Sequence, residues 1–447
     1  MTVAPRRPRQ PDHTGRTAYV NARLIDPATA LDAKGALLVD GELIADVGPG
    51  LFANGVPSGV EIIDCRGACL APGLIDIRAN LREPGEEHKE TFESGSEAAA
   101  VGGITSLVCL PDTDPPIDDA SLIEFVARRA REVRGARIYS YGAITRGLKG
   151  NEITEMGLMS LAGAVAFTDG TRAVADAVVM RRALNYARTF DALIVQHPEE
   201  RSLAADGDMN EGEVATRLGL TGIPACAESM MIERDLALVR LTGGRYHAAH
   251  ISTRGAVDCI RRAKDDGLVI TCDTAPQYFT LNETAVGDYR TFAKLSPPLR
   301  NEDDRRAIEE AVRDGTIDVI ASDHAPHDQD SKRLPFPQAE CGIVGLESLL
   351  ALSLRLHHQG GMKLVDLLRA LTARPAEILD LPGGKLAKGA PADLVLFDPA
   401  RPWRIDPDSF RSKSKNSPFE GHPVQGRVLS TIVGGRCLYE LTTEAVR

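Results

Sequence analysis

The sequence lacks the features that mark membrane, secreted or nucleic-acid-binding proteins. No apolar run approaches the ~18 residues that a membrane-spanning helix needs, and residues 1–16 contain no apolar core of a signal peptide. The formal net charge of -11 argues against nucleic acid or an anionic membrane as the main partner. We therefore expect a cytoplasmic protein whose partners are small molecules or other proteins.

Tryptophan is almost absent, and cysteine is scattered. The chain has one Trp and eight Cys, and none of the cysteines forms a Cys-x-x-Cys pair. This spacing favours reduced core thiols over a disulfide framework or a zinc knuckle. With 447 residues, of which 43% are apolar, the chain can bury a large core. A barrel of about 250 residues beside a smaller domain fits this length.

The two ends of the chain share a pattern of short strands. Residues 1–16, with three Pro and four Arg, predict a disordered basic tail. Short apolar runs then flank a turn at Asp40-Gly41, and similar runs flank Gly434-Gly435 near the other end. We expect one small flanking β-sandwich domain built from both chain ends, residues 17–70 plus 385–447.

Between these ends, residues 71–384 alternate strand-like and helix-like segments. This alternation predicts a parallel sheet with crossover helices and places the protein in the α/β class. Eight strands are predicted, the number that a closed (β/α)8 TIM-type barrel requires. They are residues 72–77, 104–110, 137–142, 163–168, 192–197, 245–250, 268–273 and 317–322.

Metal-binding residue types stand where several predicted strands end. Asp169, His197, His250 and Asp323 follow four different strands, so a barrel would bring them to one mouth. A single His at a strand end is more often hydrogen-bonded structure than a ligand. Four such positions together predict a zinc-type cluster.

The first barrel strand ends in different residue types. Arg78, Asn80 and Arg82 are spaced to project from one face of an extended backbone, because successive side chains of a strand alternate. This stretch lies between Pro72-Gly73 and Pro84-Gly85, which bound the strand.

Several motifs occur in the order and spacing found in dihydroorotases. They are Gly73-Leu-Ile-Asp76, Leu81-Arg-Glu-Pro-Gly85, Ala143-Ile-Thr145 with Gly147-Leu-Lys-Gly150, His250-Ile-Ser-Thr253, Pro297-Pro-Leu-Arg300, Ser322-Asp-His-Ala-Pro-His327, Gly342-Ile-Val-Gly-Leu-Glu347 and Lys415-Asn-Ser-Pro-Phe419. The chain therefore resembles class I dihydroorotases of the amidohydrolase superfamily over nearly its whole length after the tail. The resemblance implies a metal-dependent barrel enzyme that interconverts carbamoyl aspartate and dihydroorotate in pyrimidine synthesis.

The resemblance also implies which metal ligands are kept and which are lost. The first strand of the family normally ends in His-x-His, but here these positions are Arg78 and Asn80. A guanidinium group has no lone pair for a metal, and an amide is a poor replacement for imidazole. Matching positions imply a second metal site on Asp169, His197 and His250, with Asp323 as the catalytic base. We therefore expect one zinc ion at most, with Arg78 filling the empty position and pairing with Asp169 or Asp323.

The implied substrate-binding positions are mixed. Arg82 and His327 match the residues with which the family grips the substrate carboxylate. Asp114 and Ser296 each replace an Asn of the family pattern, and Pro276-Gln-Tyr278 replaces Pro-His-His. Asp114 would place a negative charge where an amide normally meets an anion.

These departures resemble a dihydroorotase-like branch that lacks the first-strand His-x-His and partners aspartate carbamoyltransferase. Three hypotheses remain: a dihydroorotase with a reduced, at most one-metal site; an inactive subunit that scaffolds aspartate carbamoyltransferase; and a hydrolase of another cyclic amide or ureide. We expect a homo-oligomer or a hetero-complex in each case.

Overall fold

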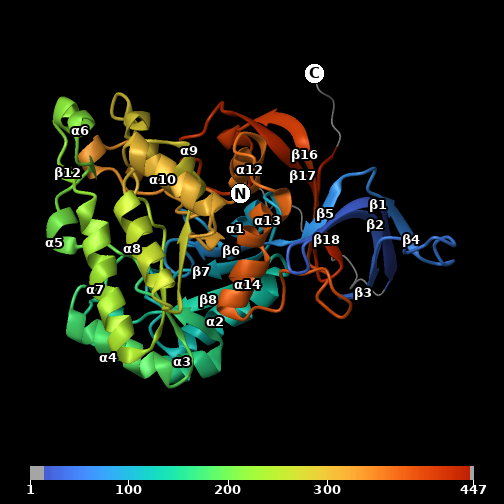
Figure 1. Ribbon diagram of the computed structural model, residues 1–447, viewed down its shortest axis with the longest axis horizontal. Helices are drawn as coiled ribbons and strands as arrows, with labels where there is room; N and C mark the ends of the chain where they lie inside the picture. The colour runs from blue at the N-terminus through green and yellow to red at the C-terminus, as the bar shows by residue number, and fades with distance from the viewer. Residues whose placement is uncertain (1–14, 443–447) are drawn as a thin grey trace, which may run out of the picture.

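The computed structural model describes residues 15–442 of the chain. Figure 1 shows a barrel surrounded by helices, with a sheet beside it that contains both the first and the last strands of the chain. Most of the predicted basic tail, residues 1–14, lies outside the described residues, whereas Arg16 already belongs to the first strand. No helix of the described part is long and apolar enough to cross a membrane.

The flanking sheet is built from both chain ends, as predicted. Its strands run in the order β18-β17-β16-β5-β1-β2-β3, and β4 pairs with β1. The two ends meet where β5 and β16 pair antiparallel, with Leu70 opposite Leu396. The strands are β1 (Arg16–Asp26), β2 (Leu31–Asp40), β3 (Leu43–Gly48), β4 (Glu61–Asp64), β5 (Cys69–Pro72), β16 (Leu394–Arg404), β17 (Pro423–Val433) and β18 (Arg436–Glu440).

All eight predicted barrel strands are present, and they form one parallel sheet in chain order. They are β6 (Leu74–Ala79), β7 (Ile104–Cys109), β8 (Arg137–Gly142), β9 (Ala164–Phe167), β10 (Leu193–Gln196), β13 (Arg245–Ala248), β14 (Ile270–Thr274) and β15 (Val319–Ile320). A parallel bridge between Ala79 and His324 links the first strand to the end of the eighth. The (β/α)8 fold expected from the sequence is confirmed.

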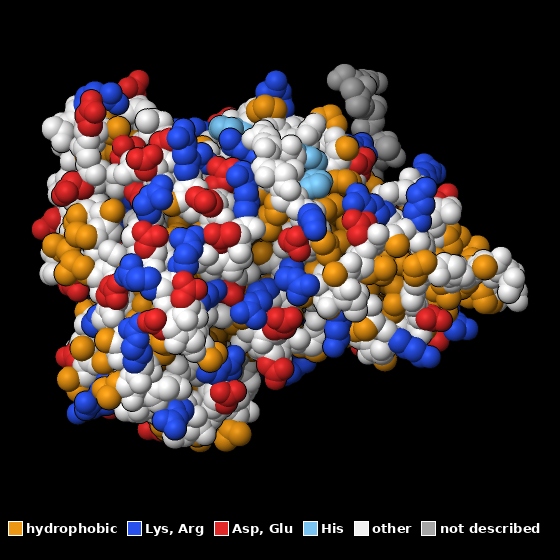
Figure 2. Space-filling model, viewed as in Figure 1, with side chains coloured by type: hydrophobic (Ala, Val, Ile, Leu, Met, Phe, Trp, Pro, Cys, Tyr) orange, Lys and Arg blue, Asp and Glu red, His pale blue; other side chains and the backbone are white. Residues whose placement is uncertain are grey.

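Helices cover the outside of the barrel, and several of them bury one apolar face against it. In α8, for example, Val257, Ile260 and Ala263 are buried at helical spacing. The longer helices are α1 (Phe92–Val101), α2 (Ala120–Val133), α4 (Ala177–Arg188), α7 (Cys226–Thr242), α8 (Arg254–Asp265), α10 (Glu302–Arg313), α12 (Leu349–His358) and α13 (Leu364–Leu371). On the face shown in Figure 2, acidic and basic side chains are interspersed over these helices.

Shorter elements connect these units. The helices are α3 (Met156–Ala162), α5 (Arg201–Ala204), α6 (Glu213–Leu218), α9 (Pro276–Thr280), α11 (Gln329–Lys332) and α14 (Ala373–Leu379), and the small strands β11 (Met209–Asn210) and β12 (Gly222–Ile223) pair with each other.

The flanking sheet and the barrel share one apolar cluster, and a second cluster lies within the sheet domain itself. Ile25, Val395 and Phe397 from the sheet belong to the same buried cluster as Leu74 and Ile104 from the barrel. Because β5 ends at Pro72 and β6 begins at Leu74, the chain passes from the sheet into the barrel almost without a linker.

Candidate active site at the barrel mouth

The end of the first strand holds a buried ion pair. All six residues of β6 are buried, and the side chain of Arg78 is only 2% exposed. Its Nε lies 2.9 Å from Oδ1 of Asp323, and its Nη2 donates to the carbonyl of Gly170 over 3.2 Å. The predicted pairing of Arg78 with Asp323 is therefore present.

Two imidazoles join this pair, which gives a mouth cluster of Arg78, His197, His250 and Asp323. Nδ1 of His250 lies 3.3 Å from the Asp323 carboxylate, and Nε2 of His250 lies 2.7 Å from Nδ1 of His197. Burial lowers the pKa of His250 to about 4, with a further contribution from Arg78, so this imidazole is neutral at pH 7.

The ionisation state of Asp323 determines which nitrogens of the cluster donate a hydrogen bond and which accept one. Burial alone would raise the pKa of Asp323, but His250 and Arg78 together hold it well below its usual range. An ionised carboxylate only accepts, so Nδ1 of His250 donates to it and Nε2 of His250 accepts from Nδ1–H of His197. Nε2 of His197 is a buried nitrogen without a hydrogen-bond partner among the described residues.

Both carboxylate oxygens of Asp169 are engaged by residues that follow β8. Oδ1 accepts from the backbone N–H groups of Ile144 and Thr145, each over 2.9 Å, and Oδ2 accepts from the hydroxyl of Thr145. Burial raises the pKa of Asp169 to about 6, although these hydrogen bonds act in the opposite direction.

The donor set fits a metal ion only in part. His197 and His250 offer imidazole nitrogens, but within residues 15–442 no group of three or more His, Cys, Asp or Glu side chains is placed to hold an ion. The 2.7 Å separation of the two nitrogens is a hydrogen-bond distance, shorter than two tetrahedral zinc ligands would keep at about 2.0 Å each from the metal. The three-ligand site on Asp169, His197 and His250 thus remains a prediction.

The predicted carboxylate-binding residues Arg82 and His327 lie together. Nη2 of Arg82 is 3.2 Å from Nε2 of His327, and both side chains are buried. Arg82 also donates to the carbonyl of Pro326 and to Glu86, so its guanidinium is engaged within the protein. Nδ1 of His327 has no hydrogen-bond partner among the described residues.

The other predicted positions surround the mouth at greater distance. Asp114 is exposed and packs beside Gly85, where an added Cβ would come within 2.2 Å of the Asp114 carbonyl oxygen. Ser296 is half-buried, and Asn80 is buried and donates its backbone N–H to the carbonyl of His324. In the described part of the structure, no side-chain hydrogen bond or ion pair joins Asp114 or Ser296 to Asp323.

Sequence analysis missed several residues that contact the mouth cluster. Gln277 donates to Asp323 over 3.2 Å, and the hydroxyl of Tyr278 lies 3.5 Å from the same carboxylate. Both belong to the Pro276-Gln-Tyr278 segment, so their position after a strand was the available signal. Oε1 of Glu199 lies 3.6 Å from Nε2 of His197. Although burial would raise the pKa of Glu199, the nearby imidazole of His197 holds it below the usual value.

A buried pair, His247 and Asp273, contacts the backbone of the cluster. His247 contacts Asp273 over 2.8 Å, and the other oxygen of Asp273 accepts the backbone N–H of His250. His250 and Asp323 both have a positive φ, 36° and 51°, which is uncommon for residues with a side chain. The pair with Asp273 thus helps to fix a backbone conformation that places His250 against Asp323.

Comparisons with known proteins agree with this architecture. Residues 50–256 match the model of the Dihydro-orotase-like family, and residues 342–439 match that of the Amidohydrolase family. The chain is 48% identical to a dihydroorotase from Anaplasma phagocytophilum over 94% of its length and 95% of that protein. It is 47% identical to a dihydroorotase from Syntrophotalea carbinolica over 94% of its length and 98% of that protein.

Solved structures share the fold at lower identity. An L-hydantoinase (dihydropyrimidinase) from Arthrobacter aurescens superimposes with a TM-score of 0.84 at 25% identity, covering 95% of this chain and 96% of that one. A dihydropyrimidinase from Brevibacillus agri gives 0.81 at 24% identity, covering 94% of each chain. Similarity to dihydroorotases over nearly the whole chain, on a barrel with a flanking sheet, shows that the chain belongs to the dihydroorotase family of amidohydrolases, which are enzymes that hydrolyse cyclic amides.

Proposed function

We propose that this protein is a dihydroorotase that interconverts carbamoyl aspartate and dihydroorotate in pyrimidine synthesis, with a site for one metal ion at most. The observation that supports this proposal is the mouth cluster, which keeps Asp323 in hydrogen-bonded contact with His250 and, through it, with His197. A carboxylate held beside two imidazoles at the mouth is suited to move protons during amide cleavage.

Ring opening adds one water across the cyclic amide. The water oxygen bonds to the carbonyl carbon, the C–N bond breaks, and the leaving nitrogen takes a proton. We assign the proton transfer from water to nitrogen to Asp323. Arg78 stabilises the ionised form of Asp323, so this residue is a weaker base than an unpaired carboxylate, and turnover is expected to be slow.

A bound metal ion would polarise the amide carbonyl and activate the water. His197 and His250 would hold such an ion, His197 through its unpartnered Nε2 and His250 only after the hydrogen bond between the two imidazoles opens. Asp169 would join them only after leaving Thr145, whose backbone and hydroxyl now occupy both carboxylate oxygens.

Arg82 and His327 are proposed to orient the substrate carboxylate. A guanidinium binds a carboxylate through two parallel hydrogen bonds, and His327 offers an unpartnered Nδ1. Substrate would then compete with Glu86 and the Pro326 carbonyl for the Arg82 donors.

The decisive experiment measures turnover of dihydroorotate by the purified protein, with and without added zinc. Chromatography monitors the reaction. Asp323→Asn should lower kcat by about 10²–10⁴-fold, because a general base contributes that much. Asp176→Asn is the matched control, since Asp176 caps α4 at an exposed position where Asn caps equally well. Unchanged turnover in Asp323→Asn would show that the base lies elsewhere.

A second candidate function is favoured by the commitment of Arg78 and Asp169 to internal partners. A mouth filled in this way suits a non-catalytic subunit that scaffolds aspartate carbamoyltransferase. Absence of turnover, with zinc content below about a tenth of an ion per chain and co-elution with aspartate carbamoyltransferase on gel filtration, would favour this candidate. Turnover of hydantoin or dihydrouracil in place of dihydroorotate would instead identify a cyclic ureide as the substrate.

A further inference from the structure

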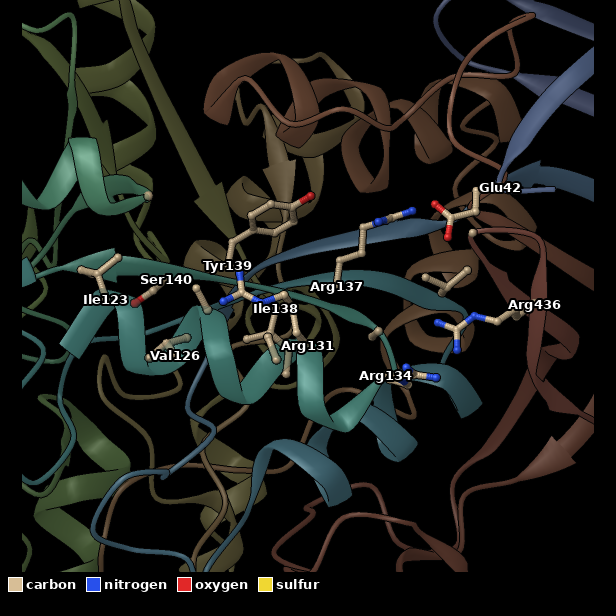
Figure 3. A pocket seen from close by; sticks show the side chains of 17 residues that line it. Glu42, Ile123, Val126, Arg131, Arg134, Arg137, Ile138, Tyr139, Ser140 and Arg436 are labelled. Carbon is tan, nitrogen blue, oxygen red and sulfur yellow. The ribbon is translucent and has the colours of Figure 1, made fainter. Parts of the chain in front are cut away.

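A second pocket lies between the barrel and the flanking sheet, away from the mouth. It has a volume of about 420 Å³ and is enclosed by α2, β8 and the turn between β17 and β18 (Figure 3). Arg137, which lines it, is the first residue of β8, whereas the residues that hold Asp169 follow the other end of that strand. The pocket and the mouth thus lie at opposite ends of β8.

The pocket is strongly basic in a protein with a formal net charge of -11. Its lining includes Arg131, Arg134, Arg137 and Arg436, with Glu42 as the single carboxylate. Arg137 is neutralised by a two-bond contact with Asp393, at 2.6 and 3.1 Å. In Figure 3 its guanidinium also points toward Glu42.

Two of the arginines lack a compensating partner. Within residues 15–442, the side chains of Arg131 and Arg436 make no hydrogen bond or ion pair with another residue. They come from different parts of the fold, Arg131 from the last turn of α2 and Arg436 from the start of β18. Figure 3 shows Arg436 and Arg134 at one end of the pocket and Arg131 reaching toward Tyr139 at the other.

The floor of the pocket is apolar. Ile123, Val126 and Ile138 are buried beneath it, and Tyr139 is half-buried at its edge. An apolar floor with unpaired guanidinium groups at both ends suits a ligand that joins a flat organic part to an anionic group. A planar guanidinium binds phosphate through paired hydrogen bonds and also stacks on aromatic rings.

We propose that this pocket binds an aromatic phosphate monoester. The phosphate lies at the Arg436 end, and the ring lies on Ile138 with Arg131 stacked beside it. Arg436 supplies the charge for any phosphate, whereas Arg131 and the apolar floor select for the ring. The site is separate from the mouth, so its occupancy does not depend on turnover.

Calorimetric titration of the full-length protein with phenyl phosphate and with inorganic phosphate tests this proposal. We expect saturable binding of one phenyl phosphate per chain with a Kd below about 1 mM, and at least about tenfold weaker binding of inorganic phosphate. Arg436→Gln should weaken both ligands about tenfold, since a hydrogen-bonded charge pair is lost. Arg131→Gln should weaken phenyl phosphate alone.

Arg128→Gln is the control, because Arg128 lies on the same helix, is exposed and contacts Phe125 rather than the pocket. It should leave both affinities unchanged. The proposal is overturned by the absence of saturable binding to the parent protein, by equal affinity for the two ligands, or by equal losses in Arg436→Gln and Arg128→Gln.

Discussion

Arg78 stands where the resemblance to dihydroorotases predicts a metal-binding imidazole, and it brings a permanent positive charge to that position. The charge is matched by Asp323, 2.9 Å away, in a mouth where little water reaches the side chains. Asp323 therefore stays ionised without a metal ion beside it. One side chain thus accounts both for the stability of the mouth cluster and for the expected weakness of its base.

Replacing Arg78 by Met should destabilise the protein by about 3 kcal/mol, because removal of one partner leaves an uncompensated buried charge on Asp323. The double variant Arg78→Met with Asp323→Asn should recover part of this loss. Thermal unfolding is measured for the parent, both single variants and the double variant. The four stabilities give the coupling free energy between the two residues. Equal losses in the Arg78→Met and double variants would contradict a stabilising ion pair.

The site shows what a single sequence can and cannot reveal at this scale. The positions of His197, His250 and Asp323 after strands were enough to predict that they meet. The hydrogen bonds that draw Asp169 to Thr145 were not predictable, because they depend on how the loop after β8 folds over the end of β9. Glu199 and Tyr278 were also missed, since their approach to the cluster depends on loop geometry.

Among the elements, strands were easier to predict than loops. β8 was predicted at its observed limits, residues 137–142, because apolar periodicity and flanking turns define a buried strand. Residues 328–341 contain α11, and Lys332 is buried there with Nζ bound to the carbonyls of Glu340 and Gly342. A lysine that donates to backbone carbonyls leaves no periodic pattern in the sequence.

The start of α12 is tied to a distant loop by a carboxyl group that responds to pH. Glu347 accepts the backbone N–H groups of Arg411 and Ser412, and burial raises its pKa to about 7 from an ordinary value of 4.5. The folded protein therefore holds this proton more tightly than the unfolded chain does. The resulting stability is fully present below pH 4.5 and is lost as the pH rises to about 7.

Glu347→Gln should reduce this loss, because the amide oxygen still accepts both N–H groups but cannot ionise. We expect the stability of the variant minus that of the parent to be about 1–3 kcal/mol higher at pH 8 than at pH 5. Melting temperatures at the two pH values measure the effect. Glu310→Gln on the exposed side of α10 is the control, and it should leave the melting temperature unchanged at both pH values. If the melting temperatures of Glu347→Gln and the parent fell equally between pH 5 and pH 8, the assignment would be contradicted.

At the scale of the whole molecule, the sequence predicted two parts but not how closely they are joined. The strand patterns at both ends correctly indicated a composite sheet. The pairing of β5 with β16 is a contact between residues about 325 positions apart, and periodicity within each strand does not specify such a partner. The same limit applies to the shared core, which depends on three-dimensional packing.

Because the sheet and the barrel share this core, they should unfold in one transition. Phe397 is fully buried in β16 within the shared cluster, and Phe397→Ala should cost about 3–5 kcal/mol. Scanning calorimetry should show a single peak at a lower temperature. Leu161→Ala, at a position that is 87% exposed, should leave the peak in place. Two separate peaks, with only one moved by Phe397→Ala, would show that the parts unfold independently.

The contact between Arg78 and Asp323 also joins the first barrel strand to the segment that follows the eighth, where the backbone contributes only the bridge from Ala79 to His324 and the bond from Asn80. The barrel is therefore closed here largely by side chains. Replacing Arg78 by histidine would therefore remove a contact that closes the barrel as well as a positive charge.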